Sequence, residues 1–285
     1  MTESAVRTIA VLGAGTMGHG IAHAAVAAGF ETRLFDVSET QLSKARAQID
    51  AVFRKAVELG KATAADVDAG LGRLSTTPQV ARAVEGADLV IEAAPERMDL
   101  KLQLMADIDA HAPAAAIVAT NTSALSITEM AGATSRPARV AGMHFFNPVH
   151  KMRLVEIVRA LETSDAALEV IDAVARTMGK ETVLVRESPG FITTRVNASI
   201  GNEAFYMLME GVASARDIDK ALRLGLNHPM GPFELVDLVG LDTRLSILEY
   251  LHRSMGEKYR PCPLLAQYVK AGRLGRKVGK GVYEY

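Results

Sequence analysis

The amino-acid sequence predicts an α/β protein in two parts, a doubly wound and mostly parallel sheet followed by an all-helical C-terminal domain. Over residues 1–187, short apolar segments rich in β-branched residues alternate with longer segments of helical periodicity, the pattern of parallel strands joined by crossover helices. After Glu187 no convincing strand follows until the last four residues, and helical periodicity fills residues 188–285. We therefore expect a domain boundary near Glu187.

Composition argues against several classes of protein. The chain has 285 residues, enough for two domains. Its 32 basic and 33 acidic residues give no reason to expect a nucleic acid or an acidic membrane as partner. Cys262 is the single cysteine, so no intramolecular disulfide can form and we expect no metal site. The segment MTESAVRT has no apolar signal core, and no apolar run is long enough to span a bilayer, so we expect a cytoplasmic protein.

A strand, a glycine turn, a helix, a second strand and an acid follow one another at the start of the chain. The strand is Thr8–Leu12, the turn is Gly13-Ala-Gly15-Thr16-Met17-Gly18, the helix is 19–28, and the second strand is Glu31–Phe35, closed by Asp36. Asp36 lies 18 residues after Gly18, close to the separation of about 20 in a dinucleotide-binding, Rossmann-like motif. This order and spacing predict a dinucleotide cofactor.

Each residue of the turn has a physical role in such a motif. Gly13 permits the tight turn, Gly15 lets the backbone approach a pyrophosphate, and Gly18 lets the helix pack against the strand. The N-terminus of the following helix would direct free N–H groups at the phosphates, and the turn residues Thr16 and Met17 are expected to contact the cofactor as well. The alternative is a glycine-rich loop without a ligand, which the complete motif disfavours.

Asp36 determines the expected choice of cofactor. Its carboxylate would accept hydrogen bonds from ribose hydroxyls and would repel a 2′-phosphate. The next two residues, Val37 and Ser38, are not basic. The sequence therefore favours NAD over NADP.

A long helical stretch separates this motif from the next strand. Residues 38–59 predict one helix and a second begins near Ala64, so we expect a pair of helices that projects from the sheet. Lys55 and Lys61 lie here and could meet a phosphorylated substrate, although a solvated helix face is the alternative for each.

Two more buried strands lead to a polar cluster. The strands are expected at 87–93 and 116–120, with a helix from Met98 to His111 between them. The second strand ends in Asn121-Thr-Ser123, at the edge where parallel strands meet a ligand crevice. A short helix follows from Ser126.

The segment Val140–Val158 holds the candidate chemistry. His144 lies in one apolar run and Glu156 in another, with the turn-favouring Asn147-Pro148 between them. If the segment folds back around His150, His144 faces Glu156 across two strands. The carboxylate would then fix one imidazole nitrogen, and the other could move a proton. The alternative is a core histidine that has found a partner.

The remaining segments complete both domains. A helix at 165–178 and a strand at 182–185 end the first domain. The second is too small to bury several apolar helices well alone, so we expect it to pack against the first domain and against a second copy of itself, giving a homodimer. Its helices are expected at 191–210, 214–224, near 233–238, 242–255 and 263–271.

Eight motifs follow one another along the chain: GAGTMG at 13–18, IEAAPE at 91–96, TNTSALSI at 120–127, HFFNPV at 144–149, LVEIV at 154–158, SPGF at 188–191, NHPMGPFEL at 227–235 and GLDT at 240–243. Each motif alone could arise by chance, but the series is specific. It resembles the short-chain 3-hydroxyacyl-CoA dehydrogenases, in particular the bacterial 3-hydroxybutyryl-CoA dehydrogenases, over essentially the whole chain.

The resemblance implies oxidation of (S)-3-hydroxyacyl-CoA to 3-oxoacyl-CoA with reduction of NAD, or the reverse, most simply on 3-hydroxybutyryl-CoA and acetoacetyl-CoA. It implies that His144 is the base for the 3-hydroxyl proton and that Glu156 orients His144. Ser123 would hydrogen-bond the substrate oxygen, and Asn147 would help to hold substrate and nicotinamide. The alternatives are a helix cap for Ser123 and a plain turn residue for Asn147.

Glu96, Lys101 and Lys277 match cofactor contacts of the family, and Lys277 lies in the C-terminal run GRKVGKG. Without the resemblance, Lys101 is expected to form a surface ion pair. The resemblance also implies that residues 1–187 bind NAD, and that residues 188–285 bind substrate and form the dimer.

The chain departs from the family at contacts with the substrate. Thr194 stands where better-known members have an active-site asparagine, and we hypothesise that Asn197, one helical turn later, partly covers that role. Val52 and Leu59 replace a serine and a lysine that some relatives use on the coenzyme A nucleotide. We therefore expect Lys55 or Lys61 to substitute as a substrate contact.

Two rival functions stay open from the sequence. A binding module could keep the fold without turnover, although His144, Glu156 and Ser123 together argue against it. A dehydrogenase for a free β-hydroxy acid would need no contact with coenzyme A, so the helices after Asp36 would have no part in its binding.

Overall fold

The computed structural model describes residues 6–285 and divides the chain into two compact units. The first unit ends at Glu187, and the second is Ser188–Tyr285. The first five residues of the segment MTESAVRT lie outside the described residues. Among residues 6–285, none of the helices combines the length and the apolar character that a transmembrane span needs.

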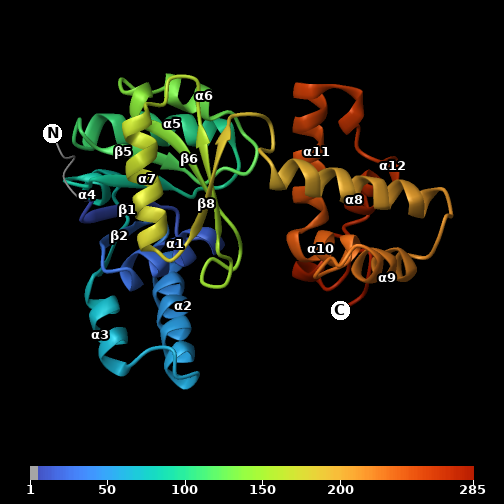
Figure 1. The fold of residues 1–285 in the computed structure, drawn as a ribbon, viewed down its shortest axis with the longest axis horizontal. Helices are drawn as coiled ribbons and strands as arrows, with labels where there is room; N and C mark the ends of the chain where they lie inside the picture. Colours follow the sequence, from blue (N-terminus) through green and yellow to red (C-terminus); the bar gives the residue numbers. More distant parts are fainter. Residues whose placement is uncertain (1–5) are drawn as a thin grey trace. The chain divides into compact units, whose positions relative to one another are not determined.

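An eight-stranded sheet forms the centre of the first unit (Figure 1). Its order is β3-β2-β1-β4-β5-β6-β7-β8, and every neighbouring pair is parallel except β6 and β7. The chain order reverses between β1 and β4, which is where a doubly wound sheet opens a ligand crevice at the carboxyl ends of its strands. The strands are β1 Thr8–Leu12, β2 Glu31–Phe35, β3 Leu74–Thr77, β4 Leu89–Glu92, β5 Ile117–Thr120, β6 Val140–Phe145, β7 Leu154–Arg159 and β8 Glu181–Arg186.

Helices cover both faces of this sheet, as right-handed crossovers require when strands are added in opposite directions from β1. One face packs against α1 and α7, and the other against α4, α5 and α6 (Figure 1). The helices are α1 Thr16–Ala27, α2 Glu39–Glu58, α3 Ala64–Gly72, α4 Val80–Val84, α5 Met98–His111, α6 Ile127–Gly132 and α7 Asp165–Thr177, with a 3-10 turn at Pro137–Arg139.

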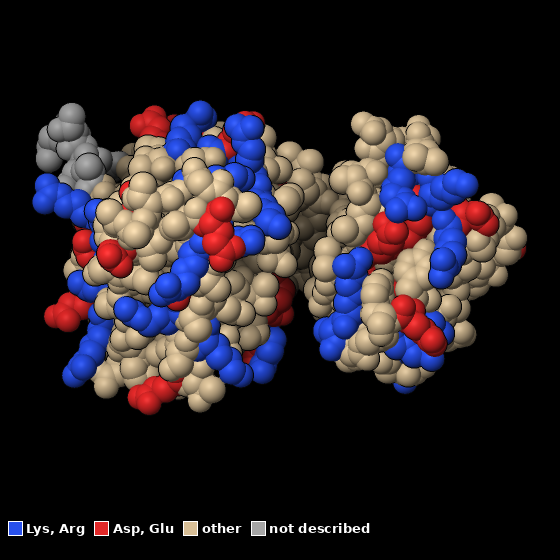
Figure 2. Space-filling view, turned by 90° about the horizontal axis from the view of Figure 1, so that it is seen from below, with Lys and Arg blue, Asp and Glu red and all other residues tan. Residues whose placement is uncertain are grey.

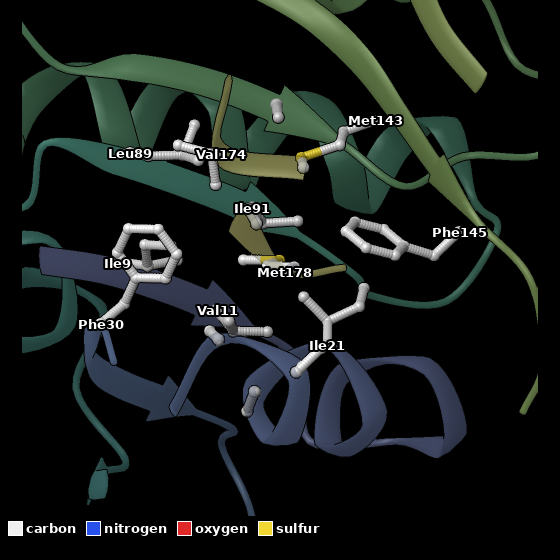
Figure 3. Packing of buried hydrophobic residues seen from close by; sticks show 14 of the residues in the cluster. Ile9, Val11, Ile21, Phe30, Leu89, Ile91, Met143, Phe145, Val174 and Met178 are labelled. Carbon is white, nitrogen blue, oxygen red and sulfur yellow. The ribbon is translucent and has the colours of Figure 1, made fainter. Parts of the chain in front are cut away.

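The core of the first unit lies between the sheet and the helices α1 and α7. Alternate residues of β1 point to this side, so Ile9 and Val11 pack with Ile91 from β4 and Ile21 from α1 (Figure 3). All four side chains are fully buried. This packing fixes the start of α1 against β1, and therefore the glycine turn between them.

The sequence correctly predicts most elements of this unit. The bounds of β1, β2 and α5 are confirmed, and so is the helical pair α2 and α3, which projects from the sheet in Figure 1. The strand β3 and the helix α4 are not predicted from the sequence. β3 is an edge strand of four residues, LSTT, with two exposed side chains, and α4 has only five residues. Both elements are too short to show the repeating pattern of apolar residues from which strands and helices are predicted.

The second unit is helical and has a buried core of its own. Phe205 and Phe233 meet edge to face with ring centroids 5.2 Å apart, and Phe205 meets Tyr268 in the same way at 5.9 Å. The last residues make isolated bridges, Gly275 with Lys280 and Lys280 with Glu284, and do not extend into a strand. The helices are α8 Thr193–Met209, α9 Ala215–Gly225, α10 Pro232–Val239, α11 Leu241–Met255 and α12 Pro263–Lys270, with 3-10 turns at Glu257–Tyr259 and Arg276–Val278.

Candidate active site

Two glycines of the turn after β1 are required by close approach of the backbone. Gly13 has a φ of +107°, and a Cβ there would lie 2.7 Å from the carbonyl oxygen of Ala93. A Cβ on Gly18 would lie 1.6 Å from the carbonyl oxygen of Gly13. Any side chain at either position would force the turn or the helix α1 to move.

Gly15 is different, because a Cβ there would meet no atom within 4 Å. Its backbone has φ −69° and ψ −164°, which any residue can adopt, and no side chain caps the helix that begins at Thr16. The first turn of α1 carries no acidic residue. Open space beside uncapped N–H groups at a helix N-terminus fits a phosphate group, so these residues fit a dinucleotide.

Asp36 lies at the end of β2 beside this turn. Its Oδ2 accepts a hydrogen bond from the N–H of Ala14 at 2.9 Å, and its Oδ1 accepts one from the N–H of Ser38 at 3.0 Å. The carboxylate is therefore oriented by the backbone, and its remaining lone pairs can still accept from a ribose.

A buried ion pair lies at the carboxyl end of β4. Lys101 is 1% exposed, and its Nζ lies 2.7 Å and 2.8 Å from the two carboxylate oxygens of Glu92, which is 0% exposed. The same Nζ donates to the carbonyl oxygen of Ala94 at 3.2 Å and lies 3.5 Å from Oε2 of Glu96. The expectation of a surface pair for Lys101 is therefore wrong, because the side chain turns under the β4–α5 loop.

Glu96 organises the turn that follows β5. Its Oε1 accepts hydrogen bonds from the Thr122 hydroxyl at 2.6 Å, from the Ser123 N–H at 2.9 Å and from the Ala124 N–H at 3.2 Å. This turn presents the hydroxyl of Ser123, and the Ser123 Oγ lies 3.1 Å from Nε2 of His144.

His144 and Glu156 face each other across the antiparallel pair β6 and β7, so the predicted fold-back and register are confirmed. Nδ1 of His144 lies 2.7 Å from Oε2 of Glu156. The histidine is 4% exposed and the glutamate 0%. A carboxylate can only accept, so the proton of a neutral imidazole lies on Nδ1, and Nε2 is then an acceptor for the Ser123 hydroxyl.

The end of β6 is held by Asn121, which the sequence places in the polar cluster after β5 but to which it assigns no role. Asn121 accepts a hydrogen bond from the N–H of Phe145 at 2.8 Å, which ties the end of β5 to the residue after His144. The signal was present, since Asn121 follows a buried strand. Asn147 is exposed in the turn after β6, and its peptide bond to Pro148 is cis.

Four basic side chains lie near one another beside α1: His19 and His23 of that helix, His150 and Lys180. The His23 ring packs on Phe53 with centroids 4.5 Å apart and lies 6.4 Å from the ring of His150. Burial, and then repulsion by the positive charges that His150, His19 and Lys180 carry when protonated, lower the pKa of His23 to about 4. His23 is therefore neutral at physiological pH.

Two of the predicted substrate contacts lie on the helical pair of the first unit. Lys55, on α2, pairs with Glu58 at 2.8 Å, and Lys61 is exposed after the end of that helix. Basic and acidic side chains are interspersed on the face of each unit in Figure 2. On the face shown, neither unit presents a continuous basic surface.

The remaining predicted residues belong to the second unit. Thr194 and Asn197 lie three residues apart near the start of α8. Lys277 pairs with Asp242, its Nζ lying 2.6 Å and 2.7 Å from the two carboxylate oxygens. Over residues 6–285, no cluster of three or more His, Cys, Asp or Glu side chains has the arrangement of a metal site.

Comparison with known proteins gives matches over both units. The family model for the 3-hydroxyacyl-CoA dehydrogenase NAD-binding domain matches residues 8–188, and the model for the C-terminal domain of the same family matches residues 190–285. A probable 3-hydroxybutyryl-CoA dehydrogenase of Bacillus subtilis is 46% identical over 281 residues, 98% of each chain. The crystal structure of (S)-3-hydroxybutyryl-CoA dehydrogenase from Ralstonia eutropha superposes with a TM-score of 0.94 at 42% identity and covers 99% of each chain.

Proposed function

Because the chain belongs to the 3-hydroxyacyl-CoA dehydrogenase family and is thus an NAD-dependent oxidoreductase, we propose that it interconverts 3-hydroxybutyryl-CoA, as the S isomer, and acetoacetyl-CoA. The names of its relatives support this short-chain pair. The proposal rests on the hydrogen-bonded chain of Ser123, His144 and Glu156 in the unit that holds the glycine turn. Nε2 of His144 lies 3.1 Å from the Ser123 Oγ, and Nδ1 lies 2.7 Å from Oε2 of Glu156.

The proposed mechanism assigns proton transfer to His144. Nε2 takes the proton of the 3-hydroxyl group while the C3 hydride leaves, so the alcohol becomes a ketone. NAD supplies the hydride acceptor when it is bound. Glu156, fully buried beside Nδ1, stabilises the imidazolium as it forms, and Ser123 holds the substrate oxygen beside Nε2.

The proposed cofactor contacts extend from the glycine turn. The backbone from Gly13 to Gly18, with Thr16 and Met17 in the first helical turn, holds the pyrophosphate. Asp36 binds the adenosine ribose and selects NAD against NADP. Glu96, Lys101, Ser123, Asn147 and Lys277 complete the proposed set.

The proposed substrate contacts lie on both units. Ser123 and Asn147 hold the reacting end of the substrate, and Thr194 donates to the thioester carbonyl with help from Asn197. Lys55 and Lys61 are the proposed contacts for the coenzyme A phosphates. Both side chains are exposed, so a phosphate can approach their ammonium groups from solvent.

We also propose a homodimer formed through the helical unit. Support comes from large apolar side chains left exposed at the two ends of α9, Val212 at 65% before its start and Leu224 at 76% and Leu226 at 66% at its end, since a protein interface buries such side chains. We propose a cytoplasmic location as well, since a chain with the single cysteine Cys262 does not use the disulfide framework common in secreted domains.

A steady-state assay tests the proposed function. The rate of NADH consumption is measured with 3-oxoacyl-CoAs of four to ten carbons, and with NADPH in place of NADH. We expect the highest kcat/KM with acetoacetyl-CoA and NADH. Absence of turnover with every substrate would favour a binding module, and equal turnover of free acetoacetate would favour a dehydrogenase for free β-hydroxy acids.

A further inference from the structure

We propose that Glu92 is a positioning residue for this reaction, acting through Lys101 and Glu96 on the turn that presents Ser123 to His144. The inference rests on the proposed function, because it concerns the same site. None of the roles assigned above uses Glu92, although it is a fully buried carboxylate at the carboxyl end of a central strand.

Glu92 receives four hydrogen bonds from three residues. Its Oε1 accepts from Lys101 at 2.7 Å and from the N–H of Ala94 at 2.6 Å. Its Oε2 accepts from Lys101 at 2.8 Å and from the hydroxyl of Thr120, the last residue of β5, at 2.6 Å. The carboxylate therefore joins the ends of β4 and β5 to the start of α5.

Lys101 depends on Glu92 for its place. Its side chain is 1% exposed, and an ammonium group in such a position is strongly disfavoured unless a negative charge lies beside it. Glu92 provides that charge at hydrogen-bond distance, whereas Glu96 lies 3.5 Å away and is 38% exposed. Without Glu92 the lysine side chain would turn towards solvent.

Glu96 in turn depends on Lys101. An exposed glutamate side chain has many rotamers, and the cation behind Oε2 favours the one in which Oε1 faces the turn after β5. In that rotamer Oε1 binds the hydroxyl of Thr122 and the N–H groups of Ser123 and Ala124. The position of the Ser123 hydroxyl beside His144 thus depends on a charge that touches neither residue.

A purely structural role does not explain this arrangement well. Buried ion pairs stabilise a fold little or not at all compared with apolar side chains of the same size, and the rest of β4 is apolar. A buried charge at this point is explained if its effect is to hold Lys101 and Glu96 in one geometry.

A double-mutant cycle tests the proposal. We expect Glu92→Gln to lower kcat at least about tenfold in the wild-type background and less than about twofold in a Glu96→Gln background. The same fold-loss in both backgrounds, or no loss in either, would overturn the proposal. Asp109→Asn is the matched control: it breaks the ion pair of Asp109 with Arg136, at 2.7 Å in the same unit, and should lower Tm while kcat stays within about twofold.

A second variant tests the proposal if the Glu92→Gln protein fails to fold. Glu92→Gln combined with Lys101→Met removes both buried charges, so no uncompensated ammonium is left. We expect the same loss of kcat, because Glu96 has lost its cation. A double variant with the wild-type kcat would contradict the proposed role.

A readout without cofactor or substrate separates this inference from the proposed function. In the apoprotein, the ¹⁵N signals of the His144 ring, assigned by their loss in His144→Gln, should shift in Glu92→Gln and stay unchanged in Asp109→Asn. Unchanged His144 signals in Glu92→Gln would overturn the inference. If the signals shift but the wild type does not turn over acetoacetyl-CoA, the positioning role stands and the proposed substrate is wrong.

Discussion

His144 illustrates how one neighbour determines the chemistry of a side chain. A carboxylate 2.7 Å from Nδ1 fixes the tautomer, and a hydroxyl 3.1 Å from Nε2 marks where a substrate oxygen can bind. Two apolar runs joined by a turn at His150 predict this pairing, because residues equally distant from the turn stand opposite each other in an antiparallel pair. The proton-transfer role of the pair is a prediction that activity measurements must test.

The burial of Lys101 could not be predicted in the same way. Its neighbours in the sequence are helical and mixed in character, and its partner Glu92 lies nine residues away in a strand. Whether a lysine turns under a loop depends on that tertiary contact, which local spacing does not encode.

Removal of the charge at Asp36 should weaken the selection of NADH. We expect Asp36→Asn to lower the ratio of kcat/KM for NADH to that for NADPH by about tenfold, roughly 1.4 kcal/mol, because the repulsion of the 2′-phosphate is lost. The ratio is the quantity to measure, since it cancels any loss of the contact between Asp36 and the N–H of Ala14. An unchanged ratio would refute the role of Asp36.

His23 should make the protein less stable in mild acid. Burial and its basic neighbours lower the pKa of His23 to about 4, so the unfolded chain takes up the proton near its ordinary pKa, before the folded protein does. The free energy of unfolding is therefore at its full value above about pH 6.5. It falls as the pH is lowered to 4, by at most about 3 kcal/mol.

Chemical denaturation of His23→Gln between pH 7 and pH 4 measures this effect. We expect the variant to lose less unfolding free energy over this range than the wild type. The control is His111→Gln, at an exposed position on α5, which should follow the wild type. Parallel curves for wild type and His23→Gln would contradict the prediction.

At the scale of elements, the glycine turn meets two separate requirements: it packs closely against neighbouring backbone at Gly18, and it leaves open space for a cofactor at Gly15. The spacing of its glycines and the position of Asp36 predict the strand, turn and helix that the structure shows. By contrast, β3 could not be predicted, because an edge strand of four residues takes its pairing from β2 and not from its own apolar pattern.

Alanine substitutions should separate these requirements. Gly18→Ala would place a Cβ 1.6 Å from a backbone oxygen, so we expect a loss of about 1–3 kcal/mol of stability in the apoprotein. Gly15→Ala meets no atom within 4 Å and should leave apoprotein stability unchanged within about 1 kcal/mol. It should nevertheless weaken NADH binding at least about tenfold, because the methyl group fills the space that the pyrophosphate needs.

Thermal unfolding of the apoproteins and fluorescence titration with NADH give the two quantities. Wild-type affinity for NADH in Gly15→Ala would show that the phosphates bind elsewhere. A Gly18→Ala protein as stable as the wild type would mean that the turn relaxes more easily than its contacts indicate.

For the whole molecule, the surface of the helical unit bears on whether two chains associate. This unit has its own core, built around Phe205, Phe233 and Leu248, yet large apolar side chains around α9 stay exposed. We expect light scattering after size-exclusion chromatography to give about twice the chain mass of 30.4 kDa at micromolar concentration, with little dependence on salt, because apolar contacts are not screened. The mass of one chain under these conditions would contradict the proposed homodimer.

The most direct test of the account compares wild type and His144→Gln with acetoacetyl-CoA and NADH. The wild type should oxidise NADH, and the variant should lose kcat by about 10²–10⁴, the usual contribution of a general acid–base. Its affinity for NADH, measured by fluorescence titration, should stay within about threefold of the wild type. Near-normal turnover in His144→Gln would contradict the account, because the proton would then be moved by another group.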